Sequence, residues 1–323
     1  MMKNFDYVKA GSIAEAIREL GSKSTMLHAG GTDLMGCMRD EVLPVEKVVS
    51  ISNLKDLKGI TSRSDGGIKI GALTTIAEIA ANTSIAQKYA VLAKAAAEVS
   101  SPQLREQGTI GGNLCQRPRC WYFRGDFHCA KKGGKTCYAV AGENEYHAIF
   151  GGGPCFFVHP SDLAVALTAL QAELVIAGSS KSRTVKIESF FVSPNKSIAK
   201  ETILENNEIV TEIHIPPLNG NVRSSYRKIR ARAAWDFALT SVAMVLQFEN
   251  DYVRTARLVL GGVAPYPWLV ESAERLLAGK KLDSAIAAEV GRASVNGAKP
   301  LRDNAYKVEM VRGAVEESIL AFA

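Results

Sequence analysis

The sequence predicts an α+β fold divided into two units, and three observations support this prediction. Strand-like and helix-like stretches occur in both halves of the chain, so neither kind of element dominates. Turn-forming residues between Pro216 and Asn221 form the clearest linker. The chain has 323 residues, of which 47% are hydrophobic, and this suffices for two or three domains with cores of their own. A globular enzyme or enzyme subunit is the default interpretation.

The first unit is expected to mix short strands with helices. Ser12 is a suitable N-cap for a helix over 12–20, whose apolar side chains recur at helical spacing. A hairpin is expected over 59–73, because Asp65 and Gly66 form a turn signal. The other predicted elements of this unit are strands over 25–31, 47–52, 172–178 and 183–191, and helices over 74–87, 91–100 and 159–170.

The second unit, about 100 residues beyond the linker, is expected to begin with long strands and to end with helices. Its predicted strands cover 226–248 and 253–268, and its predicted helices cover 271–279, 283–295 and 305–321. The second unit therefore has the same α+β character as the first.

Charge and hydropathy exclude several function classes. Lysine and arginine number 39 against 33 aspartate and glutamate residues, and this small excess is spread along the chain. A solvated surface explains it better than nucleic-acid binding does, so no nucleic-acid partner is expected. The N-terminal stretch has charges every few residues, and no later segment approaches about 18 consecutive apolar residues. We therefore expect no membrane span and, from the sequence, a cytoplasmic protein.

Two glycine motifs suggest a phosphate-binding site. Backbone N–H groups at Gly30, Gly31 and Thr32 can turn outward after a strand without interference from a Cβ atom, and the TIGGN segment over 109–113 has the same character. Each motif alone is weak, because a Gly-Gly pair is more often a tight turn. With two in one unit, a dinucleotide pyrophosphate site and a pair of simple tight turns both stay open. Neither is a GxGxxG fingerprint, so an NAD-type site is not indicated.

Five of the six cysteines lie within one glycine-rich stretch of about forty residues, and they are Cys115, Cys120, Cys129, Cys137 and Cys155. Their spacing lacks the CxxC pairs of common structural zinc sites and the CxxCxxC run of bacterial ferredoxins. A long glycine-rich loop is nevertheless suited to wrapping a buried object. A metal or cluster is favoured over disulfides and over unrelated thiols. Cys37 is expected to be a small buried apolar residue.

Other polar residues leave two interpretations open. His128 and His147 could bind zinc, although hydrogen-bonded loop histidines are commoner. Asp162 could cap a helix together with Ser161, or accept hydrogen bonds from ribityl or ribose hydroxyls. Lys228, Arg230 and Arg232 alternate on a predicted strand, where they could line an anionic ligand or form a solvated face. No Ser/His/Asp set, HExxH or Walker motif is present.

A family resemblance adds to these observations. The segments that carry it are AGGTDL near position 30, IGALTTIAEI at 70–79, QLREQGTIGGNL at 103–114, HPSDLAVAL at 159–167, YRKIRARAAWDFALTSVA at 226–243 and LGGVAPYPW at 260–268. In their order and distances they resemble the FAD-binding medium subunit of molybdenum hydroxylases, the xanthine dehydrogenase and carbon monoxide dehydrogenase family. The resemblance covers nearly the whole chain.

The cysteine stretch points to one branch of that family. Ordinary members run from TIGGN almost directly to the PxSD segment, whereas about forty residues intervene here. Such an insert resembles the subgroup that includes 4-hydroxybenzoyl-CoA reductase and the periplasmic aldehyde oxidoreductase, whose medium subunit carries an additional [4Fe-4S] cluster. The overall likeness is strongest to the aldehyde oxidoreductase type.

The resemblance implies an FAD-binding domain of the vanillyl-alcohol-oxidase or PCMH type, followed by an α+β C-terminal domain like that of carbon monoxide dehydrogenase flavoproteins. The expected division places one FAD-binding subdomain at 1–57 and the second at 58–217. The iron–sulfur loop lies at about 115–157 within the second subdomain. The C-terminal domain covers 222–323.

Site residues are carried over by position. The FAD pyrophosphate is expected between two loops, and Asp162 and Lys228 match positions that reach flavin or ribityl atoms. The expected FAD-binding residues are Met26, Leu27, His28, Ala29, Gly30, Gly31, Thr32, Asp33, Leu34, Thr109, Ile110, Gly111, Gly112, Asn113, Asp162 and Lys228. The expected cluster ligands are Cys120, Cys129, Cys137 and Cys155. An exchange of Cys115 for Cys120 stays open.

The implied function is electron transfer. Substrate chemistry is expected on a large subunit with a molybdopterin cofactor, electrons pass through two [2Fe-2S] clusters of a small subunit, and FAD in this chain meets an external acceptor. No catalytic residue for the substrate step is expected here. The substrate, the acceptor, the direction of electron flow, the subunit stoichiometry and export with a twin-arginine-bearing partner stay open. The alternatives are a free-standing FAD oxidoreductase with a zinc-stiffened loop and a non-catalytic zinc-binding interaction module.

Overall fold

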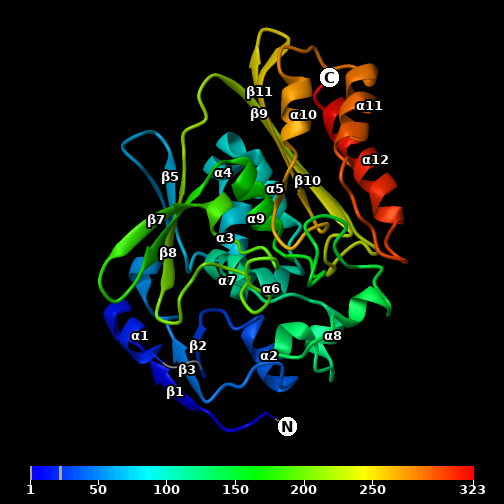
Figure 1. Cartoon of the computed structure of the whole chain (residues 1–323). Coiled ribbons are helices and arrows are strands. Elements are labelled where there is room, and N and C mark those ends of the chain that lie inside the picture. The colour runs from blue at the N-terminus through cyan, green and yellow to red at the C-terminus, as the bar shows by residue number, and fades with distance from the viewer. Residues whose placement is uncertain (1, 22–23) are drawn as a thin grey trace.

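Three sheets follow one another along the chain in the computed structural model, which describes residues 2–21 and 24–323 (Figure 1). The first is a parallel sheet in the order β1-β3-β2. Ser12 accepts a hydrogen bond from the Glu15 N–H and so starts the helix that joins β1 to β2. The elements of this part are β1 (Asp6–Lys9), α1 (Ile13–Glu19), β2 (Thr25–His28), α2 (Leu34–Arg39) and β3 (Lys47–Ser50).

The second sheet is antiparallel, in the order β4-β5-β8-β6-β7. Its register aligns Ile70 and Leu174 with Ile213 on the two neighbouring strands, and all three side chains are fully buried. The predicted hairpin is confirmed, with Gly66 at φ +87°. The strands are β4 (Ile60–Ser62), β5 (Ile68–Gly71), β6 (Glu173–Ala177), β7 (Ser182–Lys186) and β8 (Ile209–Ile215).

A group of short helices lies between β5 and β6 in the sequence. The helix of the HPSDLAVAL segment, α9, is apolar on all sides and entirely buried, as expected for a central helix. The helices are α3 (Ile76–Ala81), α4 (Thr83–Lys88), α5 (Ala90–Ala97), α6 (Pro102–Gln107), α7 (Ile110–Leu114), α8 (Trp121–Arg124) and α9 (Asp162–Ala169).

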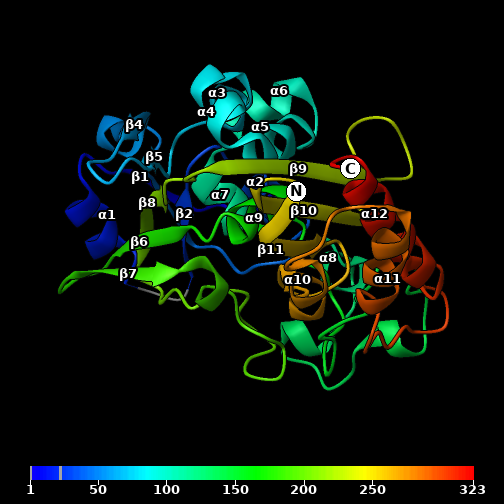
Figure 2. The ribbon, with the colours of Figure 1, turned by 90° about the horizontal axis from the view of Figure 1, so that it is seen from above.

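The third sheet is antiparallel, in the order β12-β11-β10-β9, and helices cover both its faces (Figure 2). Helices α5 and α9 pack on one face, whereas α10 and α12 pack on the other. Strand β10 is consequently buried along nearly its whole length. The elements are β9 (Asn221–Ile229), β10 (Thr240–Glu249), β11 (Tyr252–Gly261), β12 (Trp268–Leu269), α10 (Glu271–Leu277), α11 (Ser284–Ala293) and α12 (Tyr306–Leu320).

The α+β class is confirmed, but several predicted boundaries are wrong. Strand β9 already begins at Asn221, inside the predicted linker, and ends at Ile229. Arg230 and Arg232 therefore lie beyond the strand and do not share a strand face with Lys228. The helix predicted over 74–87 is two helices, because Asn82 ends α3 and its side chain caps α4.

The helices are short, and the longest among the described residues is α12 with 15 residues. Within the part of the chain that the structure describes, no helix has the length and apolar character needed to cross a membrane.

Candidate functional site

The two glycine segments lie beside one cavity of about 270 Å³. The first segment follows β2, and the second forms the start of α7. The predicted residues that line this cavity are Met26, Leu27, Ala29, Gly30, Gly31, Thr32, Asp33, Leu34, Thr109, Gly111 and Gly112. Three predicted residues face elsewhere: the His28 ring lies 3.3 Å from the Ser50 hydroxyl, Ile110 is in the core, and Asn113 contacts Ser161.

Glycine is required where each segment closely approaches backbone outside the segment. A Cβ atom at Gly30 would lie 1.8 Å from the carbonyl oxygen of Gln107, and one at Gly111 would lie 3.0 Å from the carbonyl oxygen of Ala72. Gly31 adopts φ +73°, which other residues rarely do. Because these residues have no side chain, their backbone atoms themselves form part of the cavity wall.

The backbone N–H groups of the two segments differ. Those of Gly30, Gly31 and Thr32 have no recorded protein acceptor among the described residues, so they can donate to an anion. In the second segment the N–H of Ile110 donates to Thr74 and that of Gly111 donates to Ala72. The Gly112 N–H donates to the Thr109 hydroxyl, which caps α7. TIGGN therefore has fewer unengaged N–H groups than the first segment, and its part in binding phosphate stays a prediction.

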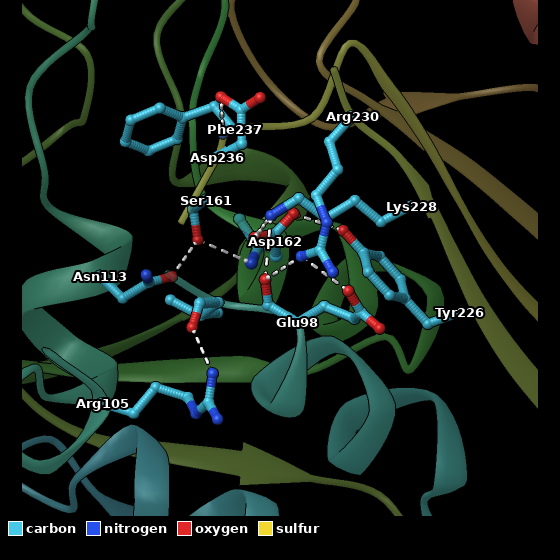
Figure 3. Close-up of polar contacts among 12 residues, drawn as sticks. Glu98, Arg105, Asn113, Ser161, Asp162, Tyr226, Lys228, Arg230, Asp236 and Phe237 are labelled. Atoms are coloured by element: carbon cyan, nitrogen blue, oxygen red, sulfur yellow. Dashed lines mark hydrogen bonds and ion pairs between the residues drawn. The ribbon is translucent and has the colours of Figure 1, made fainter. Parts of the chain in front are cut away.

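A larger cavity of about 390 Å³ begins at the N-terminus of α9. It joins three parts of the chain: the cysteine loop, the 157–162 segment, and the bends between β9 and β10. The lining residues are Arg119, Cys120, Trp121, Tyr146, His147, Phe157, Val158, His159, Pro160, Ser161, Asp162, Val165, Asp236, Phe237, Ala238, Ser241 and Gly262. Ser161 caps α9 and hydrogen-bonds Asn113, which connects this cavity to the second glycine segment (Figure 3).

A buried ion pair supports the larger cavity (Figure 3). The Lys228 ammonium lies 2.7 Å from one Asp162 carboxylate oxygen, and the Tyr226 hydroxyl donates to the other at 2.6 Å. Lys228 also donates to the Glu98 carbonyl at 3.0 Å. Burial raises the pKa of Asp162, and Lys228 opposes that rise. Both Asp162 oxygens are thus engaged within the protein, and the interpretation of Lys228 as part of a solvated strand is wrong.

An arginine and two buried histidines line the larger cavity. Nε of Arg119 has no hydrogen-bond partner in the described chain, whereas the ring of His147 is hydrogen-bonded to the backbone of Asn144 and that of His159 to the backbone of Leu114. Burial lowers the pKa of His147 to about 4 and that of His159 to about 3, so both rings are neutral near pH 7. An unpaired buried polar atom such as Nε of Arg119 is costly, and an ordered water or a polar ligand would satisfy it. The sequence did not predict Arg119, His147 or His159 as an FAD-binding residue, although His159 directly precedes the PSD segment.

The four predicted cluster ligands surround one small cavity. Cys120, Cys129, Cys137 and Cys155 line it together with aromatic rings and Lys131. Cys129 and Cys155 are buried, and Cys137 and Cys155 share a side-chain hydrogen bond that lowers the pKa of Cys137 and raises that of Cys155. Burial raises the pKa of Cys120 to about 11. The structure thus gathers thiols that are far apart in the sequence.

The other two cysteines lie outside this cavity. Cys115 ends α7 and lines the glycine cavity, where burial raises the pKa of its thiol to about 12. Cys37 is buried in α2, and its sulfur accepts a hydrogen bond from Arg124 at 2.8 Å. The sequence spacing alone did not separate Cys115 from Cys120, whereas the fold does.

Ion pairs tie the cysteine loop to the rest of the protein. The Asp33 carboxylate accepts from Arg119 at 2.9 Å and from Arg124 at 2.8 Å, so the first glycine segment is joined to α8. Lys131 is buried against Glu201 with an Nζ to Oε1 distance of 2.7 Å. Burial lowers the pKa of Lys131, and Glu201 acts in the opposite direction.

The cysteine cavity offers four thiols, which is the number of protein ligands that a [4Fe-4S] cluster uses. Among the described residues, no three His, Cys, Asp or Glu side chains form a group that could hold a single metal ion. In a [4Fe-4S] cluster each thiolate binds a different iron, so the four sulfurs need not converge on one point. The space between them is about 10 Å³, which is smaller than a four-iron core. The cysteine side chains therefore have to turn apart to bind one.

Two family models cover nearly the whole chain. The FAD binding domain in molybdopterin dehydrogenase matches residues 3–218, and the CO dehydrogenase flavoprotein C-terminal domain matches residues 224–321. This chain belongs to the FAD-binding medium subunits of the molybdenum hydroxylases. The matched FAD-binding domain includes all the residues that line the glycine cavity.

Similar proteins agree with this membership. The aldehyde oxidoreductase FAD-binding subunit PaoB of Escherichia coli K12 is 35% identical, over 100% of this chain and 99% of PaoB. The glyceraldehyde dehydrogenase medium chain of Sulfolobus acidocaldarius is 28% identical, over 95% of this chain and 94% of its own length. A carbon monoxide dehydrogenase structure from Hydrogenophaga pseudoflava shares the fold, with a TM-score of 0.79 and 24% identity over 100% of this chain and 99% of that one. The family's fold is thus that of this chain.

Proposed function

We propose that the chain is the FAD- and [4Fe-4S]-containing electron-transfer subunit of a heteromeric molybdenum hydroxylase of the aldehyde oxidoreductase type. The observation that carries this proposal is a shared wall: Cys120 and Phe157 line both the larger cavity and the cysteine cavity. FAD held in the first cavity and a cluster held in the second would be separated by these side chains, which would suit electron transfer.

The partners follow from the family. The PaoB relative is an FAD-binding subunit of an aldehyde oxidoreductase, and it aligns over the full length of this chain. The proposal therefore includes a large molybdopterin-cofactor subunit, where the substrate is oxidised, and a small subunit with two [2Fe-2S] clusters. This chain passes electrons between those clusters and an external acceptor.

In this proposal, residues of the chain bind and orient FAD. The N–H groups of Gly30, Gly31 and Thr32 would donate to the pyrophosphate, and the pair of Asp162 and Lys228 would support the base of the larger cavity. FAD supplies the exchange between two-electron and one-electron transfer, whereas the protein supplies binding and charge. No side chain of this chain serves as acid, base or nucleophile in the substrate step.

The cluster ligands in this proposal are Cys120, Cys129, Cys137 and Cys155. We further propose that residues 1–57 and 58–217 are the two FAD-binding subdomains. The iron–sulfur loop at about 115–157 is an insertion in the second, and 222–323 is the C-terminal domain. The separation of the chain into three successive sheets supports this division.

The ligand set is tested by two cysteine variants. Cys129→Ser should lose most of the iron and acid-labile sulfide per chain, because a serine oxygen replaces one of four thiolates. Cys115→Ser is the matched control and should keep both, since Cys115 lines the other cavity. Iron and sulfide are measured on anaerobically purified protein. Full retention in Cys129→Ser, or loss only in Cys115→Ser, would show that the ligand set is wrong.

A further inference from the structure

A buried lysine stands at the wall of the cysteine cavity. Lys131 follows Cys129 by two residues, in a short 3-10 helix over Ala130–Lys132. Only 1% of its side chain is exposed, and the residue lines the same cavity as the four cysteines. A lysine is rarely buried this completely unless it has a partner.

The ammonium is held in one place by several contacts. It donates to the Ile198 carbonyl at 2.7 Å and lies 2.7 Å from a Glu201 oxygen. Its Nζ is also 4.4 Å from the centre of the Phe157 ring, which borders the cavity. Glu201 is itself buried, and its other oxygen pairs with Arg117 at 3.0 Å. Two cations therefore share one carboxylate beside the cavity.

Two arginines of the loop pair with a carboxylate that lies away from the cysteine cavity. Arg119 and Arg124 both pair with Asp33, and Arg124 lies on the α2 side of the loop. Neither of them lines the cysteine cavity, whereas Lys131 does. Of the charged side chains in the described chain, Lys131 is thus the one at the cavity wall.

We propose that the buried pair of Lys131 and Glu201 sets the reduction potential of the cluster. This inference rests on the proposed function, because it requires a cluster bound by the four cysteines. Reduction by one electron adds one negative charge to the cluster, and a nearby cation stabilises that more negative form. Screening is weak in a buried site, so the effect of a fixed charge is large there. Glu201 holds the lysine in place and offsets part of its charge.

Substitutions at the two residues should shift the midpoint potential of the cluster in opposite directions. Lys131→Gln removes a positive charge while keeping a hydrogen-bond donor, so the midpoint potential of the cluster should shift to more negative values. Glu201→Gln removes a negative charge, so the potential should shift to more positive values. If the pair served only to hold the loop, both variants would disturb the cluster in the same direction.

The test is an EPR-monitored redox titration of the purified holo-complex. Lys135→Gln is the control, because Lys135 is an exposed lysine of the same loop and its charge is screened by solvent. Its potential should equal that of the wild type. Iron and sulfide content are measured first on every protein, and absence of a cluster in the wild type contradicts the proposed function rather than this inference.

With the cluster present, opposite shifts in Lys131→Gln and Glu201→Gln support the inference. An unchanged potential in Lys131→Gln overturns it, and so do shifts of the same sign in both variants. Loss of the cluster from both variants would also overturn it, because the pair would then be a structural support of the loop.

Discussion

At the scale of single residues, the glycine cavity depends on positions where only glycine fits. Gly30 lies where the first glycine segment touches the backbone of Gln107, and the adjacent N–H groups have no recorded acceptor in the part of the chain that the structure describes. A Cβ atom there would contact backbone, which cannot move aside as the end of a flexible side chain can. The binding of a pyrophosphate should therefore depend on this position more than on most polar side chains nearby.

We expect Gly30→Ala to weaken FAD binding about tenfold or more, since a displacement that costs about 1.4 kcal/mol already has this effect. FAD content after purification and the dissociation constant from flavin fluorescence measure it. Gly36→Ala is the control, because a Cβ atom at Gly36 in α2 meets nothing within 4 Å. That substitution should keep FAD and stabilise the helix by about 0.5–1 kcal/mol. Normal FAD binding by Gly30→Ala would contradict the assigned pyrophosphate position.

At the scale of elements, the end of the cysteine loop is fastened to the start of α12. We call residues 303–307 the α12 clamp. Asn304 is fully buried and donates to the carbonyls of His147 at 3.0 Å and Ala148 at 3.4 Å. Lys307 donates to the carbonyls of Tyr146 and Gly262, and no carboxylate is recorded beside it among the described residues. The last helix of the chain thus fixes the segment that brings His147 to 3.3 Å from the Cys120 sulfur.

Removing the central amide of the α12 clamp should loosen this segment. Asn304→Ala leaves two buried carbonyls without a donor, at a cost of about 1–3 kcal/mol. The thermal midpoint should fall, and hydrogen exchange over 144–150 should become faster. Asn296→Ala, at an exposed position, is the matched control and should change neither. Unchanged exchange over 144–150 in Asn304→Ala would mean that the clamp does not hold the loop.

Helix caps and tight turns were predictable because the residues that form them are close together in the sequence. The cap at Ser12 and the turn at Asp65 and Gly66 depend on residues a few positions apart, and both are found. The parallel strand β1 was missed, because four partly exposed residues carry no clear alternation. The split of 74–87 into two helices was missed because Asn82 acts at once as a stop and as a cap.

At the scale of the whole molecule, the site is built from contacts that no short pattern contains. Tyr226 and Asp162 are 64 residues apart, and Asp33 and Arg124 are 91 residues apart, so neither pair could be read from spacing. The resemblance supplied the cysteine set, but only the fold separates Cys115 from the others by placing it at a different cavity. The side chains of Arg119, His147 and His159 also come to one cavity only when distant segments meet.

The central claim is that one chain holds both FAD and a four-iron cluster. The most direct test quantifies FAD, iron and acid-labile sulfide on the protein purified anaerobically. The account predicts about one FAD, about four iron atoms and about four sulfides per chain. Zinc in place of iron with no sulfide, or no iron after careful anaerobic reconstitution, would contradict it.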